Sequence, residues 1–186
     1  MNEIGRRRPA HQSVYERRNT PVIVFLTVCT KNRKAILASH SVHQLLRAAL
    51  QIEPSWLVGR YVIMPDHLHL FCAPAEMHPQ PLTKWMSFWK SFVARHWPNR
   101  DQTPVWQCHF WDTQVRRGEN YDEKWEYVVQ NPVRAGLAPR FEDWPYQGRI
   151  EHSAMVNGGT APSRLGMMGR MGGTTERVLP LKNFVA

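Results

Sequence analysis

Two kinds of hydrophobic pattern alternate between residues 21 and 131. Runs of β-branched and aromatic residues, which are typical of strands, occupy residues 21–30, 56–64, 67–73 and 105–115. Apolar side chains at helical spacing occupy residues 41–51, 82–97 and 120–131. The Pro65-Asp66 step separates two of the strand-like runs and predicts a turn, so those two runs should pair as a β-hairpin.

The order of these segments is β-α-β-β-α-β followed by a further helix. This order predicts an α+β fold of the ferredoxin-like, RRM-like type, in which an antiparallel βαββαβ sheet carries two helices on one face. The additional C-terminal helix is then expected near the other face. One domain is expected at residues 20–147, with an arm at 1–19 and a flexible, Gly- and Met-rich tail at 148–186.

The chain is basic, with a formal net charge of +9 over 186 residues, which favours a polyanionic partner. The N-terminal arm is expected to be an exposed basic segment that contributes Arg6, Arg7, Arg8, Arg17 and Arg18. Within the predicted domain, the candidate phosphate contacts are Lys84, Lys90, Arg95, Arg116, Arg117 and Arg134. A solvated tail and a merely basic surface are the alternatives.

Neither a signal peptide nor an apolar run of the roughly 20 residues that span a bilayer is visible in the sequence. The cysteines Cys29, Cys72 and Cys108 are odd in number and form no CxxC pair, which argues against a disulfide framework. We therefore expect a cytoplasmic protein with no membrane partner.

Two histidines stand two residues apart in the run 67–73. Because successive side chains of a strand point to opposite faces, His67 and His69 should project from the same face of the sheet. Two neutral imidazoles on one strand can bind a divalent metal ion from one side. A His-x-His pair is weak evidence on its own, and two unrelated surface histidines are the alternative.

A tyrosine projects from the polar side of the last predicted helix. The apolar stripe of this helix consists of Tyr121, Trp125, Val128 and Val129. Tyr121 is therefore expected to face the core. Tyr127 lies two positions after Trp125, about 200° round the helix, and should point away from the stripe.

A free phenol is a poor nucleophile at neutral pH. A metal ion that polarises the phosphate makes attack by such a weak nucleophile easier. An amide oxygen from Gln130 or Asn131, about one turn after Tyr127, can complete the site as a third ligand. The Asn131-Pro132 step is also expected to stop the helix, which gives Asn131 a second possible role. A mixed nitrogen and oxygen shell predicts Mg²⁺ or Mn²⁺ rather than a closed zinc site.

Three segments, taken in order, resemble a known family. They are YVIMPDHLHLF at 61–71, VWQCHFWDTQVRRGENY at 105–121 and YVVQNPVRAGL at 127–137. Together they resemble the single-tyrosine HUH transposases, and among these the REP-associated tyrosine transposases (RAYTs), where REP stands for repetitive extragenic palindrome. The histidine–hydrophobic–histidine motif corresponds to His67-Leu68-His69. The family nucleophile corresponds to Tyr127 in a Tyr-x-x-x-Asn-Pro-Val pattern, and the resemblance covers about residues 20–140.

The resemblance implies cleavage and rejoining of single-stranded DNA next to a hairpin, through a 5′-phosphotyrosine intermediate and a divalent metal ion. It implies hairpin DNA with REP-like palindromes as the partner, and it is compatible with a monomer or a homodimer. Asn131 is then the preferred third metal ligand and Gln130 the alternative, because four residues along a helix lie nearer to the Tyr127 direction than three. The competing hypotheses are a non-catalytic DNA- or RNA-binding module and a small metal-dependent phosphodiesterase in which Tyr127 only packs.

Overall fold

The structure is a computed structural model that describes residues 22–76, 78–115 and 121–152. Its strands are β1 (Ile23–Cys29), β2 (Trp56–Ile63), β3 (His67–Pro74), β4 (Trp111–Val115) and β5 (Gln147–Arg149). They form one sheet in the order β4-β1-β3-β2-β5, and every neighbouring pair is antiparallel. The first four strands and the two helices between them have the βαββαβ order, so the predicted ferredoxin-like fold is confirmed.

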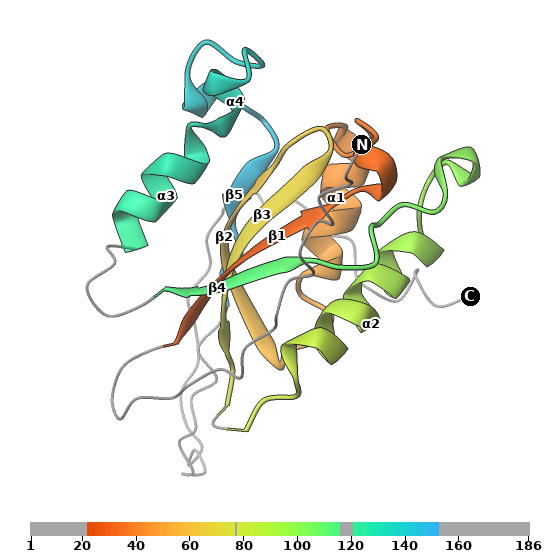
Figure 1. Ribbon diagram of the computed structural model, residues 1–186, viewed down its shortest axis with the longest axis vertical. Helices are drawn as coiled ribbons and strands as arrows, with labels where there is room; N and C mark the ends of the chain where they lie inside the picture. Colours follow the sequence, from red (N-terminus) through yellow and green to blue (C-terminus); the bar gives the residue numbers. More distant parts are fainter. Residues whose placement is uncertain (1–21, 77, 116–120, 153–186) are drawn as a thin grey trace, which may run out of the picture. The chain divides into compact units, whose positions relative to one another are not determined.

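One face of the sheet is covered by α1 (His40–Ala49) and α2 (Leu82–Arg95), as Figure 1 shows. Ser39 caps α1, because its hydroxyl accepts a hydrogen bond from the backbone N–H of Val42. The larger hydrophobic core lies between these helices and the sheet. The stripe predicted for residues 82–97 is confirmed, since it is buried at Leu82, Trp85, Met86, Trp89, Val93 and Trp97.

The opposite face of the sheet carries α3 (Tyr121–Val129) and the short α4 (Asn131–Arg134), as expected for the additional helix (Figure 1). A second hydrophobic cluster joins these helices to the sheet through Val62, Met64, Phe71, Val128, Val129 and Trp144. The indole N–H of Trp144 donates to the Ile63 carbonyl at 2.9 Å, which fastens the segment after α4 to β2.

The fourth strand is shorter than the sequence predicts, because it begins at Trp111 rather than at Val105. The preceding residues leave the sheet and are held by other partners. Trp106 forms an isolated bridge with Thr30, and the Lys90 ammonium group donates to the carbonyl oxygens of residues 107, 108 and 109. Backbone groups that the ladder does not satisfy are thus satisfied by a side chain.

The predicted end of the third helix at Asn131-Pro132 is confirmed to within two residues, since α3 ends at Val129, but a separate short helix that was not predicted, α4, begins at Asn131. Pro132 lies in the first turn of α4, where a missing N–H removes no intrahelical hydrogen bond.

The chain also forms β5 at the point where the sequence suggested that a tail begins, and Ile150 after it is buried. The division into arm, domain and tail stays a prediction, because residues 1–21 and 153–186 lie outside the described residues. Among the helices that the structure describes, none is long and apolar enough to cross a membrane.

Candidate active site

The imidazole rings of His67 and His69 converge on the face of the sheet that carries α3. Their Nε2 atoms lie 3.1 Å apart. Leu68 and Leu70, which alternate with the histidines along β3, belong to the core on the other face, so the predicted shared face is confirmed. The lone pairs of two unprotonated Nε2 atoms at this distance repel each other unless a proton or a cation lies between them.

Each histidine is held in place through its second ring nitrogen. The Nδ1 atom of His67 lies 2.6 Å from Asp66 Oδ1, and the Nδ1 atom of His69 lies 3.0 Å from the Thr27 hydroxyl on β1. A carboxylate only accepts hydrogen bonds, so His67 donates from Nδ1 and keeps its Nε2 lone pair free. Asp66 is itself fixed by Arg33, whose Nε lies 2.7 Å from Oδ2. Such outer partners are typical of metal-binding histidines.

Both histidines are biased towards the neutral form, which is the form that binds metals. Burial lowers the pKa of His69 to about 3, and the charges of His67, Arg33 and Arg134 act in the same direction. Burial also lowers the pKa of His67, while the hydrogen bond and the charge of Asp66 oppose this effect.

The geometry of the pair suits a divalent ion. Two ligand atoms at about 2.1 Å from an ion and at a right angle to each other lie about 3.0 Å apart, close to the observed Nε2 separation. The described residues contain no cluster of three or more His, Cys, Asp and Glu side chains that could hold a metal ion. A complete shell therefore needs an amide oxygen, water or substrate in addition to His67 and His69.

Tyr127 lies on the exposed side of α3, as the helical phase predicts, and 66% of the residue is accessible to solvent. Val128 and Val129, which follow it, are buried against the sheet in one cluster with Met64. Met64 is hydrogen-bonded to the His67 carbonyl. The C-terminal end of α3 therefore lies at the end of the sheet that carries the histidines.

Arg134 links the tyrosine to the rest of the site. Its guanidinium carbon lies 4.1 Å from the centroid of the Tyr127 ring, and Nη2 donates to the Tyr127 carbonyl and to the Asn131 side-chain oxygen. Its positive charge is one of those that lower the pKa of His69. Arg134, on α4, thus contacts the tyrosine and acts electrostatically on His69.

The choice of third ligand stays a prediction. The Asn131 oxygen accepts a hydrogen bond from Arg134, and a carbonyl oxygen has a second lone pair for another partner. Gln130 occupies the position before α4, and its side chain does not cap that helix. Asn131 is thus hydrogen-bonded to the same arginine that contacts Tyr127. This contact favours Asn131 over Gln130 as the third ligand.

Several side chains of the site are missed by reading the sequence. Phe25 stacks on His69 at 5.3 Å, and the Lys124 ammonium group lies 5.4 Å from the centroid of the Phe25 ring. Trp111 is the register partner of Thr27, which is the register partner of His69, and 44% of Trp111 is exposed. Asp66 has a sequence signal, since it precedes His67, whereas Thr27, Phe25 and Trp111 join the site only through strand register.

The predicted basic contacts that the structure describes lie on both faces of the sheet. Lys84, Lys90 and Arg95 lie on α2, on the face of the sheet opposite the histidines, and Lys90 is engaged with three backbone carbonyls. Arg134 is on α4, on the same face of the sheet as the histidines, and contacts the Tyr127 ring. The remaining candidates lie outside the described residues and stay predictions: Arg6, Arg7, Arg8, Arg17, Arg18, Arg116 and Arg117.

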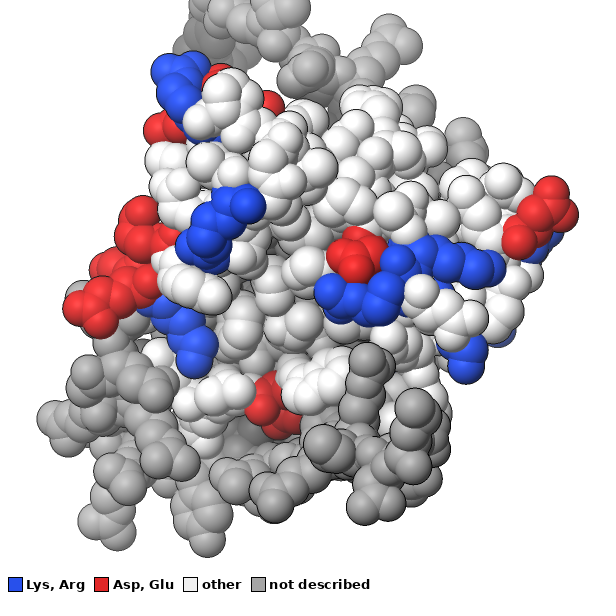
Figure 2. All heavy atoms as spheres, turned by 45° about the horizontal axis from the view of Figure 1, so that its top comes forward, with Lys and Arg blue, Asp and Glu red and all other residues white. Residues whose placement is uncertain are grey.

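The charge distribution restricts the path of a polyanion. On the face shown in Figure 2, basic side chains form separate groups with uncharged surface between them, and acidic side chains gather at the side where α3 lies. Asp122, Glu123 and Glu126 supply acidic groups on that helix, and all three are exposed. A negatively charged strand is therefore disfavoured on the outer side of α3 and favoured on the uncharged and basic surface beside it.

A ferredoxin-like sheet with a histidine pair on one strand, and a helical tyrosine on the same face, is the arrangement implied by the resemblance to single-tyrosine HUH transposases. No protein-family model matches the chain. A REP-associated tyrosine transposase of Escherichia coli (strain K12) is 24% identical over 124 residues, which cover 66% of this chain and 73% of the relative.

The fold is also similar to that of a solved relative. The structure of a REP-associated tyrosine transposase bound to a REP hairpin is 25% identical, with a TM-score of 0.56, and the match covers 73% of this chain and 82% of that one. The resemblance to REP-associated tyrosine transposases is thus confirmed in sequence and in fold.

Proposed function

We propose that this protein is a transposase-like enzyme that cleaves and rejoins single-stranded DNA at hairpin structures of REP-like palindromes, with Tyr127 as the nucleophile. The observation that carries the proposal is the arrangement around Arg134. This one side chain contacts the Tyr127 ring and Asn131 and acts electrostatically on His69. The similar protein whose structure contains a REP hairpin supports the choice of DNA partner.

In the proposed step, the Tyr127 hydroxyl oxygen attacks a phosphorus atom of the strand. The new bond joins the tyrosine oxygen to phosphorus and the bond from phosphorus to the 3′ oxygen breaks, which leaves a 5′-phosphotyrosine and a free 3′ hydroxyl. The phenol loses its proton to solvent and the leaving oxygen takes one up. Attack by a 3′ hydroxyl on the phosphotyrosine reverses these bonds and rejoins the strand.

The residues of the site divide this work. His67 and His69 would hold a divalent ion, Mg²⁺ or Mn²⁺, with Asn131 or, alternatively, Gln130. Such an ion supplies polarisation of the phosphate and charge neutralisation when bound. Arg134 orients the Tyr127 ring and offers positive charge to the phosphate oxygens. Asp66 and Thr27 fix the histidine rings, so that both Nε2 atoms face the same point.

The direct test is a covalent adduct assay. The full chain is incubated with a single-stranded oligonucleotide that carries a REP-like hairpin, in Mg²⁺, in Mn²⁺ and in EDTA, and the products are separated under denaturing conditions. We expect a protein–DNA adduct with either metal ion and none in EDTA, together with a product that ends in a 3′ hydroxyl.

The assay also distinguishes the competing functions. Hairpin binding without an adduct or cleavage would identify a non-catalytic DNA- or RNA-binding module. Metal-dependent cleavage without an adduct would identify a phosphodiesterase in which Tyr127 takes no covalent part. Either result would overturn the proposal.

A further inference from the structure

A pocket of about 260 Å³ opens on the same face of the sheet as the histidine pair, farther along β3. His67, His69, Phe71 and Ala73 lie on this face, at steps of about 6.6 Å along the strand. Phe71 and Ala73 line the pocket, and His69 is two residues before Phe71. A single strand of nucleic acid with a phosphate at the histidines therefore has the pocket within reach of its neighbouring nucleotides.

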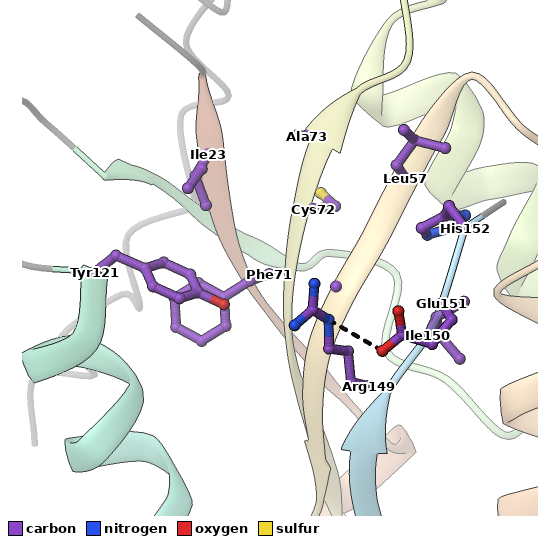
Figure 3. A pocket seen from close by; sticks show the side chains of 11 residues that line it. Ile23, Leu57, Phe71, Cys72, Ala73, Tyr121, Arg149, Ile150, Glu151 and His152 are labelled. Carbon is purple, nitrogen blue, oxygen red and sulfur yellow. Dashed lines mark ion pairs between the residues drawn. The ribbon is translucent and has the colours of Figure 1, made fainter. Parts of the chain in front are cut away.

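One side of the pocket is aromatic. Figure 3 shows the rings of Phe71 and Tyr121 together on one side, with Arg149, Glu151 and His152 on the other. The two ring centroids are 5.0 Å apart, with the rings tilted by 72°. Phe71 is buried and Tyr121 half-buried, so the tyrosine ring supplies the accessible part of this wall. Such a wall suits a flat, apolar ring that enters between it and Arg149.

Arg149 lines this pocket, and Arg60 contacts its aromatic wall at Tyr121. Arg60 and Arg149 are direct register partners on β2 and β5, an arrangement that brings like charges together. The Arg60 guanidinium group lies over the rings of Tyr121 and Trp125, at 5.5 and 5.2 Å from their centroids. Two arginine side chains that project from neighbouring strands beside an aromatic wall can bind an anion that is attached to an aromatic ring.

The acidic partners of these arginines leave room for such an anion. Arg60 lies 3.6 Å from Asp122 and Arg149 lies 3.4 Å from Glu151, and both carboxylates are largely exposed. These distances exceed the roughly 2.7–2.9 Å of a close charge-assisted hydrogen bond. The two ion pairs therefore hold the arginines loosely, and a phosphate can replace or supplement the carboxylates.

We infer that this pocket binds one unpaired nucleotide of the DNA strand that is cleaved at the histidine pair, an inference that rests on the proposed function. The base stacks against Tyr121 over Phe71, and its phosphate lies between Arg60 and Arg149. The pocket is then the place where the enzyme recognises the single-stranded segment beside a hairpin, separately from the hairpin itself.

Gly59 provides a sharp test, because it lines the pocket and has no side chain. A Cβ atom at this position would meet only the Phe71 carbonyl oxygen, at an ordinary contact distance of 3.8 Å. Gly59→Leu should therefore fill the pocket while the fold is kept, and Gly59→Ala is the matched control that leaves most of the space open. Arg149→Gln tests the phosphate part at an exposed side chain.

The probes are a short single-stranded oligonucleotide and the same strand with abasic sites, compared by fluorescence anisotropy with the full chain. We expect wild type and Gly59→Ala to prefer the strand with bases by about 5- to 100-fold, and Gly59→Leu to show a clearly smaller preference, because base stacking in the pocket is lost. Arg149→Gln should weaken binding of both strands alike and reduce the dependence on salt by about one phosphate contact.

No preference for bases in the wild type would overturn the inference, as would an undiminished preference in a folded Gly59→Leu protein. If Gly59→Leu does not fold, an unchanged affinity and salt dependence of Arg149→Gln would overturn it. Base preference does not depend on cleavage. A protein that discriminates bases through this pocket but forms no adduct would contradict the proposed function and leave the pocket assignment standing.

Discussion

The guanidinium group of Arg134 lies over the ring of Tyr127, 4.1 Å from the ring centroid, and donates hydrogen bonds to the Tyr127 carbonyl and the Asn131 side-chain oxygen. A cation that stacks on an exposed tyrosine restricts the directions in which its hydroxyl can point. Because 66% of Tyr127 is accessible, little else in its surroundings restrains the ring. Arg134 is therefore a positioning residue as well as a candidate phosphate contact.

Replacing Arg134 by lysine should separate these two roles. Lysine keeps the positive charge but has neither the planar fork nor the stacking of arginine. We expect DNA affinity to change by no more than about 2-fold, since the phosphate attraction is retained. The rate of adduct formation should fall by at least about 10-fold, equivalent to about 1.4 kcal/mol.

Arg140→Lys is the matched control, because Arg140 is an exposed arginine whose partner is Asp143. It should leave both the affinity and the rate unchanged. An Arg134→Lys protein that forms adducts at the wild-type rate would show that stacking on Tyr127 has no part in the reaction.

The second prediction is that Tyr127, and not Tyr121, becomes attached to DNA. Tyr127→Phe removes a hydroxyl from an exposed ring, so the fold should persist while adducts disappear. Tyr121→Phe should still form adducts, because its ring packs against Phe71 and does not lose that contact. Peptide mapping of the trapped adduct checks the assignment. A labelled peptide that contains Tyr121, or an adduct with Tyr127→Phe, would contradict it.

The sequence predicts the parts of this site that depend on local periodicity. Alternation along a strand is enough to place His67 and His69 on one face, and the helical period is enough to turn Tyr127 away from the core. Neither requires knowledge of which strands are neighbours. The shared face of the histidines and the exposure of Tyr127 were for this reason predictable.

The parts that depend on tertiary neighbours were not predictable in the same way. Thr27 bonds to His69 from a strand 42 residues earlier, and only the β1–β3 register brings them together. Lys90 looked like a phosphate contact, yet it binds three carbonyls of a segment that the β pattern assigned to a strand. β5 is three residues long, too short to produce a visible alternation.

The third prediction concerns Asp66, which accepts the Nδ1–H hydrogen bond of His67. Asp66→Asn removes the carboxylate that raises the basicity of this imidazole and fixes its orientation. We expect Mn²⁺ affinity, measured by calorimetry without DNA, to fall by about 10- to 100-fold. Asp143→Asn is the control, because that carboxylate pairs with Arg140 on the surface. Equal Mn²⁺ affinities in the Asp66 variant and wild type would count against His67 as a ligand.

The fourth prediction is a pH dependence of stability in metal-free buffer. The pKa of His69 is lowered to about 3 by burial, whereas an unfolded histidine has a pKa near 6.5. Between these values the unfolded chain binds more protons than the folded one. The free energy of unfolding should therefore decrease as the pH falls below about 6.5, by at most about 1.4 kcal/mol per pH unit for this group.

Denaturant titrations between pH 7 and pH 5 measure this effect. His69→Gln removes the titrating ring and should give a shallower pH dependence than the wild type, while His78→Gln, at an exposed residue, controls for the type of substitution. If His69→Gln lost stability with pH as steeply as the wild type, protonation of other groups would govern the acid sensitivity.

The last prediction assigns Trp111 to the binding of unpaired bases beside the histidine pair. Trp111 and His69 are both register partners of Thr27, so they lie on the same face, two strand spacings or about 10 Å apart. The exposed indole offers a surface on which a base can stack. Trp111→Ala should weaken binding of a single-stranded oligonucleotide by about 1–3 kcal/mol.

Phe88→Ala is the matched control, because Phe88 is equally exposed but lies on α2, on the opposite side of the sheet. Anisotropy titrations in which both substitutions weakened binding equally would show that Trp111 has no specific place in the DNA path.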